Sequence, residues 1–311
     1  MKAKSKKYIG GMTLKLLTFN QQGKERLGVR VKEGVIDVIA AKEKHPNDVI
    51  ATTMMDLIEG GDSAYQALSQ YITTLDKTDR DYMKDEADIT WDAAITRPRK
   101  IICVGLNYQK HADETKAPYP KVPVLFNKFD NALSGHLNEV KVPRTTERLD
   151  HEVELGIVIG KKAQHVDEKD ALNYVFGYCT TNDLSARDIQ KRSPQWMTGK
   201  TSDGFAPVGP YIVTTEDVAN PDQLKITTKV NGELRQNSNT SDMIFDCSEL
   251  ISYISSHMTL YPGDLIMTGT PEGVILGRPM EERVYLQPGD EVTVEVEGLG
   301  ALTTYFIEDV E

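Results

Sequence analysis

The strongest structural signal in the sequence is one run at residues 150–160, Asp150-His151-Glu152-Val153-Glu154-Leu155-Gly156-Ile157-Val158-Ile159-Gly160. Its second half is apolar and stops at Gly160, which predicts a buried β-strand ending there. Alternate side chains of a strand share a face, so Glu152 and Glu154 are expected to point the same way, about 7 Å apart. Two carboxylates at the mouth of an apolar strand are costly to bury without a positive charge between them. The run therefore predicts a strand whose first residues attract a cation.

A third carboxylate follows a second apolar run. Residues 174–182 predict another strand, Asp183 comes directly after it, and a helix is expected over residues 184–191. Three carboxylates at strand ends form the oxygen-rich set that Mg²⁺, Mn²⁺ or Ca²⁺ prefers. No cationic residue is matched to each of them, so the metal-free cluster is expected to repel itself. From these residues alone, an exposed acidic strand face is the commoner explanation, because Glu-x-Glu is a frequent pattern.

Composition argues against several classes of protein. The 311 residues carry a net charge of −11, which disfavours a surface for nucleic acid or for an anionic membrane. No apolar run approaches the ~20 residues of a membrane span. Three widely spaced cysteines, at positions 103, 179 and 247, lie in apolar stretches and are expected to be reduced core residues. These features predict a cytoplasmic protein.

The pattern of the chain divides it near residue 98. Residues 1–97 are expected to form a small α+β domain, and residues 98–311 a larger domain dominated by strands. Within the second part, Asn231 and Gly232 predict a tight hairpin turn. Further short strands, separated by turn residues, are expected at residues 265–267, 292–296 and 302–306. The predicted fold class is therefore α+β and β-rich.

Helices are predicted in both parts. Helical spacing over residues 53–75 is interrupted at residues 60–63 by Gly-Gly-Asp-Ser, which is expected to supply an N-cap. The charge-dense residues 76–88 are expected to be a solvated connection. Residues 243–258 predict an amphipathic helix with Ser248 as its cap.

A possible acid–base pair follows the strand expected at residues 101–104. If residues 107–114 form a helical turn, His111 and Glu114 lie at i and i+3, close enough to touch. A carboxylate beside an imidazole raises its basicity and fixes its tautomer, which suits a general base. From spacing alone, a surface helix with an ordinary histidine remains the commoner explanation.

Three further side chains are candidates for substrate binding. Arg187 and Gln190 lie four and seven residues after Asp183 and are expected on its helix face, where Arg187 could instead hold a carboxylate in place. Thr270 belongs to a Gly-Thr-Pro loop whose hydroxyl and N–H groups could bind a substrate carboxylate, although an ordinary turn is the alternative.

Two histidines are left out of the predicted metal site. His151 neighbours Glu152 and is therefore expected on the opposite side of the strand. His136 lies in a loop with no evident partner.

Six runs in one order resemble the fumarylacetoacetate hydrolase family, in particular its smaller acylpyruvase-like members. The resemblance covers about residues 99–311 and is specific because all six runs occur in register. It implies a mixed β-sheet roll with a small N-terminal domain packed on the catalytic domain, and a homodimer. The matching runs are residues 102–111, 150–156, 177–190, 199–201, 230–236 and 268–274.

The resemblance also implies roles for individual residues. It makes Glu152, Glu154 and Asp183 the ligands of Mg²⁺ or Mn²⁺, with Ca²⁺ an alternative. It makes His111 with Glu114 the base, on a mobile segment followed by a lid at residues 115–122. From the sequence alone Lys200 would be a solvated lysine, but the resemblance places its ammonium in the site, where it would stabilise an enolate.

The implied function is a divalent-metal-dependent hydrolase that cleaves a C–C bond of a small 2,4-dioxo acid such as an acylpyruvate. In that reaction His111 activates water, and the enolate of pyruvate is the leaving group. The same site could instead decarboxylate oxaloacetate, or isomerise 2-hydroxyhepta-2,4-diene-1,7-dioate or 5-carboxymethyl-2-hydroxymuconate. A scaffold with an inactive site is the alternative that is not an enzyme.

Overall fold

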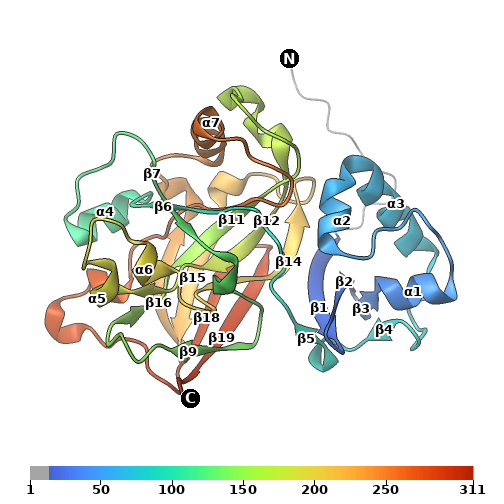
Figure 1. Cartoon of the computed structure of the whole chain (residues 1–311), viewed down its shortest axis with the longest axis horizontal. Coiled ribbons are helices and arrows are strands. Elements are labelled where there is room, and N and C mark those ends of the chain that lie inside the picture. The colour runs from blue at the N-terminus through green and yellow to red at the C-terminus, as the bar shows by residue number, and fades with distance from the viewer. Residues whose placement is uncertain (1–13, 311) are drawn as a thin grey trace.

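The computed structural model describes residues 14–310 (Figure 1). Most of its strands join one large sheet. The main path of this 12-stranded sheet runs β4-β3-β2-β1-β14-β12-β11-β17-β6-β7, with β5 paired to β1 and β8 to β14. The sheet is mixed, because β17 and β6 are parallel whereas most neighbours are antiparallel. Its strands are β1 Lys15–Gln21, β2 Lys24–Val31, β3 Gly34–Asp37, β4 Met83–Lys84, β5 Thr90–Trp91, β6 Ile101–Gly105, β7 Val124–Lys128, β8 Leu133–Ser134, β11 Val153–Ile159, β12 Val175–Asn182, β14 Ala206–Thr214 and β17 Leu265–Met267.

A five-stranded sheet, in the order β16-β15-β18-β19-β9, packs against the middle of the large one. Strands β11, β12 and β14 contact β15, β18 and β19, so the two sheets share one apolar core. This arrangement confirms the strand-rich α+β fold. The added strands are β9 Asn138–Val142, β15 Lys225–Val230, β16 Glu233–Asn239, β18 Glu291–Val296 and β19 Gly300–Glu308, and a separate pair joins β10 Leu149–Asp150 to β13 Ser185–Ala186.

The helices are mostly short and lie around the sheets (Figure 1). Helices α1 to α3 belong to the N-terminal part, and α4 to α6 lie together near the ends of the central strands. The α-helices are α1 Val38–Lys44, α2 Met54–Glu59, α3 Gly61–Thr74, α4 Gln109–Thr115, α5 Arg187–Gln190, α6 Met197–Lys200 and α7 Cys247–His257. The 3-10 helices are η1 Glu86–Asp88, η2 Asp130–Ala132, η3 Glu168–Tyr174, η4 Pro221–Gln223, η5 Thr240–Asp242, η6 Ile275–Gly277 and η7 Met280–Glu282.

The strand expected from residues 150–160 is β11, and all seven of its residues are buried. It lies between β12 and β17, which explains why its apolar half is continuous rather than alternating. Glu154 belongs to this strand and Glu152 comes immediately before it. The central strands therefore carry the acidic residues into the interior.

The N-terminal strands continue the large sheet, because β1 pairs with β14 through Lys15 and Leu16. The division of the chain at residue 97/98 stays a prediction, and residues 1–13 lie outside the described part. Residues 76–88 are not a simple solvated connection: they contain β4, η1 and the fully buried Tyr82. The sequence alone could not show that one aromatic residue anchors this polar stretch in the core.

Two predicted helix starts were wrong in detail. The break at residues 60–63 supplies no side-chain cap to α3, whereas Thr53 caps α2 through a hydrogen bond from Asp56 N–H (3.1 Å). The helix expected over residues 184–191 begins only at Arg187, because Ser185 and Ala186 pair with β10. Tertiary pairing overrides local helical spacing here. The Asn231-Gly232 hairpin turn is confirmed, with positive φ at both residues.

Helix α7 begins after a cap that differs from the predicted one. Asp246, not Ser248, is the N-cap, and its side chain accepts a hydrogen bond from Glu249 N–H (2.9 Å). The Glu249 side chain in turn accepts from Asp246 N–H (3.0 Å), which completes a capping box.

We expect Asp246→Ala to lower the free energy of unfolding by about 1 kcal/mol, because the amide groups at the helix start lose their acceptor. Ser248→Ala, two residues further along the chain, is the matched control and should change stability far less. Urea unfolding followed by circular dichroism measures both. Equal losses in the two variants would contradict the assignment of the cap.

His136 has partners that the sequence did not reveal. Its ring packs edge-on against Trp91, with 4.9 Å between ring centroids, and its Nδ1 accepts a hydrogen bond from Thr303 N–H (3.0 Å). Burial lowers the pKa of His136 from 6.5 to about 4. The neutral imidazole therefore links β5 of the N-terminal part to β19.

The His136 imidazole binds a proton more weakly in the folded protein than in the unfolded chain. His136 should therefore lower the free energy of unfolding as pH falls from 6.5 towards 4. Replacing it by Gln keeps an acceptor for Thr303 N–H but removes the titration. Thermal unfolding of His136→Gln should therefore depend less steeply on pH in this window than that of the wild type. His257→Gln, at an exposed position in α7, is the control, and parallel pH curves for all three proteins would refute the idea.

All three cysteines are free and buried, as predicted. No helix within residues 14–310 is both long and apolar enough to cross a membrane.

Candidate active site

Three buried carboxylates meet where β11 begins and β12 ends. Val153 pairs with Asn182 across these antiparallel strands, so the residues before β11 lie beside those after β12. A hydrogen bond from Asp183 N–H to the Glu152 carbonyl oxygen (2.8 Å) closes this end of the ladder. One oxygen from each of Glu152, Glu154 and Asp183 lies within 4.8 Å of the others. The structure thus brings the three predicted metal ligands together.

Cationic side chains surround two of these carboxylates, which corrects the expectation of an unmatched acidic cluster. Lys200 Nζ lies between Glu152 Oε2 and Asp183 Oδ2, at 2.7 Å from each. Lys128 Nζ lies 2.6 Å from Asp183 Oδ1. Burial would lower the pKa of Lys200, but the charges of Asp183 and Glu152 outweigh it and raise that pKa. Lys128 comes from a distant part of the chain, so local sequence could not reveal its charge, whereas the family resemblance had already placed Lys200 in the site.

Lys128 is a site residue that sequence reasoning missed. It ends β7, is 2% exposed, and also donates to the carbonyl oxygens of Leu184 (3.1 Å), Phe205 (2.8 Å) and Lys200. A lysine at the end of a strand usually reaches solvent, so only its apolar neighbours hinted at burial. Its contacts tie the segment after Asp183 to the end of α6.

Helix α6 is seated closely enough to bring Lys200 into the cluster. Gly199 lies against the backbone of Gln190, where an added Cβ would be 2.4 Å from the Gln190 amide nitrogen. Any side chain at position 199 would therefore force α6 away from α5. Glycine here lets Lys200 reach the carboxylates.

Glu154 differs from the other two carboxylates. Among residues 14–310 it forms no ion pair, and its Oε2 accepts a hydrogen bond from Gly269 N–H (2.9 Å). Burial and the nearby Asp183 and Glu152 raise the pKa of Glu154. Burial also acts against ionisation of Glu152, but Arg187 and Lys200 outweigh it and hold the pKa of Glu152 well below its usual range. In the metal-free cluster, repulsion between the carboxylates therefore disfavours ionisation of Glu154 most.

The chemistry of this donor set fits a divalent cation. Its ligand atoms are carboxylate oxygens, which are the hard ligands that such cations prefer. Lys200 Nζ contacts the oxygens of two of these carboxylates, which indicates that the cluster attracts positive charge. Glu154 has no cationic partner of its own among the described residues and would gain most from a bound metal.

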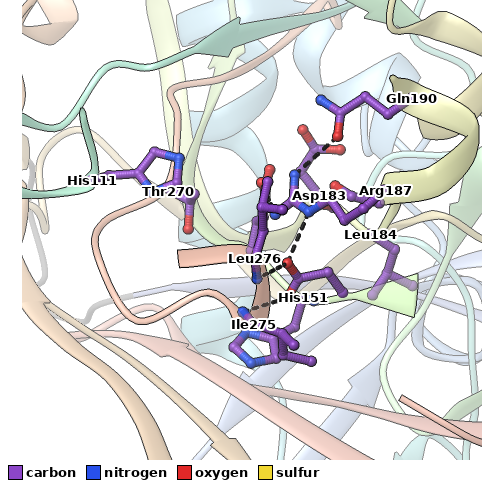
Figure 2. A network of polar contacts seen from close by, with 12 residues as sticks. His111, His151, Asp183, Leu184, Arg187, Gln190, Thr270, Ile275 and Leu276 are labelled. Carbon is purple, nitrogen blue, oxygen red and sulfur yellow. Dashed lines mark hydrogen bonds and ion pairs between the residues drawn. The ribbon is translucent and has the colours of Figure 1, made fainter. Parts of the chain in front are cut away.

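Arg187 reaches the cluster from a direction that the sequence did not predict. Rather than facing Asp183, its guanidinium bridges Asp150 Oδ2 (2.8 Å) and Glu152 Oε1 (2.5 Å). Its Nη1 donates to Gln190 Oε1 (3.1 Å) (Figure 2). Arg187 therefore orients a carboxylate of the cluster, which was the alternative role, and it also holds the side chain of Gln190.

His111 and Glu114 form the predicted pair on α4. His111 Nδ1 lies 2.8 Å from Glu114 Oε1, and Glu114 Oε2 accepts a hydrogen bond from Gly273 N–H (2.9 Å). With Nδ1 engaged, His111 Nε2 is the nitrogen left for proton transfer. His111 is 6% exposed.

One cavity of about 200 Å³ joins these groups. The volume lies below the ~300–1,000 Å³ of sites for drug-sized ligands, which favours a substrate of few carbons. Seven of the nine predicted site residues line it: His111, Glu152, Glu154, Arg187, Gln190, Lys200 and Thr270. Its apolar wall is made by Val104, Leu106, Phe126, Trp196 and Leu276.

Gln236 holds the Thr270 loop in place and was not identified from sequence. Its Nε2 donates to Thr270 Oγ1 and to the Pro271 carbonyl oxygen, each at 2.9 Å. Its Oε1 lies 3.1 Å from His151 Nδ1. His151 is therefore buried outside the acidic cluster, while the Thr270 hydroxyl keeps its own proton available to donate into the cavity.

We expect Lys200→Met to destabilise the metal-free protein by roughly 3–5 kcal/mol, because two buried carboxylates lose a cation. Adding Mn²⁺ should raise the melting temperature of this variant more than that of the wild type, in which Lys200 already supplies part of the positive charge. Thermal unfolding with and without Mn²⁺ tests this. Lys169→Met, which removes an exposed pair with Asp167, is the control. Equal Mn²⁺ shifts in all three proteins would count against a cation site here.

Comparison with known proteins gives a consistent result. The family model described as fumarylacetoacetate (FAA) hydrolase C-terminal matches residues 100–307. Oxaloacetate tautomerase FAHD2B, mitochondrial, from Bos taurus is 41% identical over 271 residues, which are 86% of this chain and 82% of the relative.

Solved structures agree with the sequence matches. Fumarylacetoacetate hydrolase from Exiguobacterium antarcticum superposes with a TM-score of 0.76 at 34% identity, covering 95% of this chain and all of that one. 5-Carboxymethyl-2-hydroxymuconate delta-isomerase from Mycobacterium smegmatis gives a TM-score of 0.72 at 31% identity, covering 96% of this chain and all of that one. These similar proteins carry three different activity names.

Proposed function

This chain belongs to the fumarylacetoacetate hydrolase family, and we propose that it is a divalent-metal-dependent enzyme that interconverts the keto and enol forms of oxaloacetate or a similar small 2-oxo acid. The observation that carries the proposal is the small cavity shared by a buried three-carboxylate cluster and the His111–Glu114 pair. The tautomerase relative, similar over most of both chains, favours oxaloacetate among the possible substrates.

Keto–enol conversion requires a proton to leave C3 and another to reach the oxygen on C2. His111 Nε2 would take the C3 proton, and Glu114, which lies beside Nδ1, would stabilise the imidazolium that forms. Lys200 is the ammonium that can donate to the oxygen as it gains negative charge. A divalent cation held by Glu152, Glu154 and Asp183 would supply Lewis-acid stabilisation of that charge.

The remaining polar groups suit the binding of a dicarboxylate. The Thr270 hydroxyl and Gln190 side chain line the cavity and can hydrogen-bond to substrate carboxylates. Phe126 and Trp196 form an aromatic wall, with 5.5 Å between their ring centroids, that would exclude water from that side of a bound substrate.

Hydrolysis of a 2,4-dioxo acid is the second candidate, and the His111–Glu114 pair favours it because such a pair also activates water. His111 would remove a proton from water, whose oxygen attacks the C4 carbonyl. The C3–C4 bond then breaks, its electron pair forms the enolate of pyruvate, and protonation at C3 completes the reaction. Decarboxylation of oxaloacetate passes through the same enolate without attack by water, and dienoate isomerisation needs proton transfers only.

A substrate panel tests the proposal. Purified protein with Mg²⁺ or Mn²⁺ should accelerate ketonisation of the oxaloacetate enol, followed by loss of its ultraviolet absorbance, and EDTA should abolish the acceleration. The panel also measures hydrolysis of acylpyruvates, decarboxylation of oxaloacetate and isomerisation of a hydroxymuconate-type dienoate. Faster turnover of an acylpyruvate would promote hydrolysis to first place, and no turnover of any compound would favour an inactive scaffold.

We expect His111→Asn to slow tautomerisation and any acylpyruvate hydrolysis by about 10²–10⁴, the usual loss when a general base is removed. Decarboxylation should fall much less, because no water is activated and no C3 proton is removed in that reaction. His257→Asn, on the exposed face of α7, should leave all rates unchanged. An equal loss of all three activities in His111→Asn would mean that His111 serves chiefly to hold the site closed.

Homodimer formation, the lid at residues 115–122 and cytoplasmic location remain predictions. Thr115 and Ala117 line the cavity, which supports a covering role for this segment. The Bos taurus relative is named as mitochondrial, so fractionation of cells is needed to place this protein.

A further inference from the structure

Asp150 is a fully buried carboxylate that lies outside the cavity and outside the acidic cluster. It ends β10, and four donors converge on it. Asp150 Oδ1 accepts from His151 N–H and Ile275 N–H, both at 2.9 Å. Asp150 Oδ2 accepts from Leu276 N–H at 3.0 Å and Arg187 Nε at 2.8 Å. Figure 2 shows the four residues that donate these hydrogen bonds, His151, Arg187, Ile275 and Leu276.

The first side leads to the acidic cluster. The Arg187 guanidinium contacts Asp150 through Nε and Glu152 through Nη2, so a rigid planar group spans the two carboxylates. If Asp150 were uncharged, Arg187 would have one carboxylate partner instead of two. The orientation of Glu152, a ligand of the proposed metal, therefore depends on Asp150.

The second side leads to the acid–base pair. The segment 273–277 is held by Asp150 at Ile275 and Leu276 and by Glu114 at Gly273. Gly277 also packs tightly on Glu114, since an added Cβ would lie 2.4 Å from Glu114 Cδ. Asp150 thus fixes one face of a short segment whose other face seats the carboxylate partner of His111.

We propose that Asp150 is a positioning residue that fixes the acidic cluster and the His111–Glu114 pair relative to each other. It acts on the cluster through Arg187 and on the pair through segment 273–277. This inference rests on the proposed function, because it assumes that both halves act on one substrate. It assigns Asp150 no contact with substrate.

The alternative is that Asp150 only stabilises the fold, as a buried ion pair with no influence on the site. Asp264 provides a matched control for that role. It is also fully buried, it pairs with Lys100 Nζ at 2.6 Å, and it accepts hydrogen bonds from Lys100 N–H and Tyr261 N–H. It does not line the cavity.

The test compares Asp150→Asn, Asp264→Asn and the wild type in three measurements. Calorimetric titration should show Mn²⁺ binding weakened about 10–100-fold in Asp150→Asn and little changed in Asp264→Asn. At saturating Mn²⁺, kcat of Asp150→Asn should stay at least 10-fold below that of the wild type, because the acid–base pair is displaced as well. Amide hydrogen exchange should accelerate at Gly273, whose N–H bonds to Glu114 and not to Asp150.

Arg187→Lys separates the two sides and replaces Asp150→Asn if that variant fails to fold. A lysine cannot span Asp150 and Glu152, so Mn²⁺ affinity should fall while Gly273 keeps its protection from exchange. The inference is overturned if Asp150→Asn binds Mn²⁺ like the wild type, if saturating Mn²⁺ restores its full kcat, or if Gly273 exchange is unchanged.

Failure of the proposed function would look different. If the wild type neither binds Mn²⁺ nor turns over oxaloacetate, the proposed function is wrong. The exchange measurement at Gly273 needs neither metal nor substrate, and it still decides whether Asp150 controls the position of the segment on which Glu114 rests.

Discussion

The burial of three carboxylates beside apolar strands is the constraint on which the rest of the site depends. An isolated carboxylate in a protein interior is strongly disfavoured unless cations or hydrogen-bond donors compensate it. Lys128, Lys200 and Arg187 supply three cations, and each is itself buried. Those cations in turn require α5, α6 and the end of β7 to converge on one point. The local architecture thus follows from charge compensation as much as from apolar packing.

The compensation is uneven, and that unevenness has chemical consequences. The side-chain oxygens of Glu152 and Asp183 contact cationic side chains, whereas within residues 14–310 the Glu154 side chain accepts a hydrogen bond only from a backbone N–H. If a cationic side chain neutralised every carboxylate of the cluster, its affinity for a metal ion would be low. Leaving one carboxylate without a cationic side chain keeps the cluster ready for an added positive charge, while the fold tolerates the metal-free state.

Some features could be predicted because they depend on residues close together in sequence. The apolar second half of β11, the Asn231-Gly232 turn and the His111–Glu114 spacing are local patterns with one favoured geometry each. The errors arose where a tertiary contact outweighed local preference. Ser185 and Ala186 leave the expected helix to pair with β10, and Tyr82 anchors a stretch that its charges made look solvated.

By itself the sequence determined the strand-rich fold and the kinds of side chain that meet in the site. Both follow from the hydrophobic periodicity and from the six family-like runs, which are local features of the chain. Only the tertiary structure decided which charges pair. Arg187 was expected to face Asp183 but bridges Asp150 and Glu152 instead, and Lys128 joined the site from an edge strand. The physical reason is that these partners are separated by tens of residues, so their distances are set by how strands and short helices pack and not by the spacing of residues along the chain.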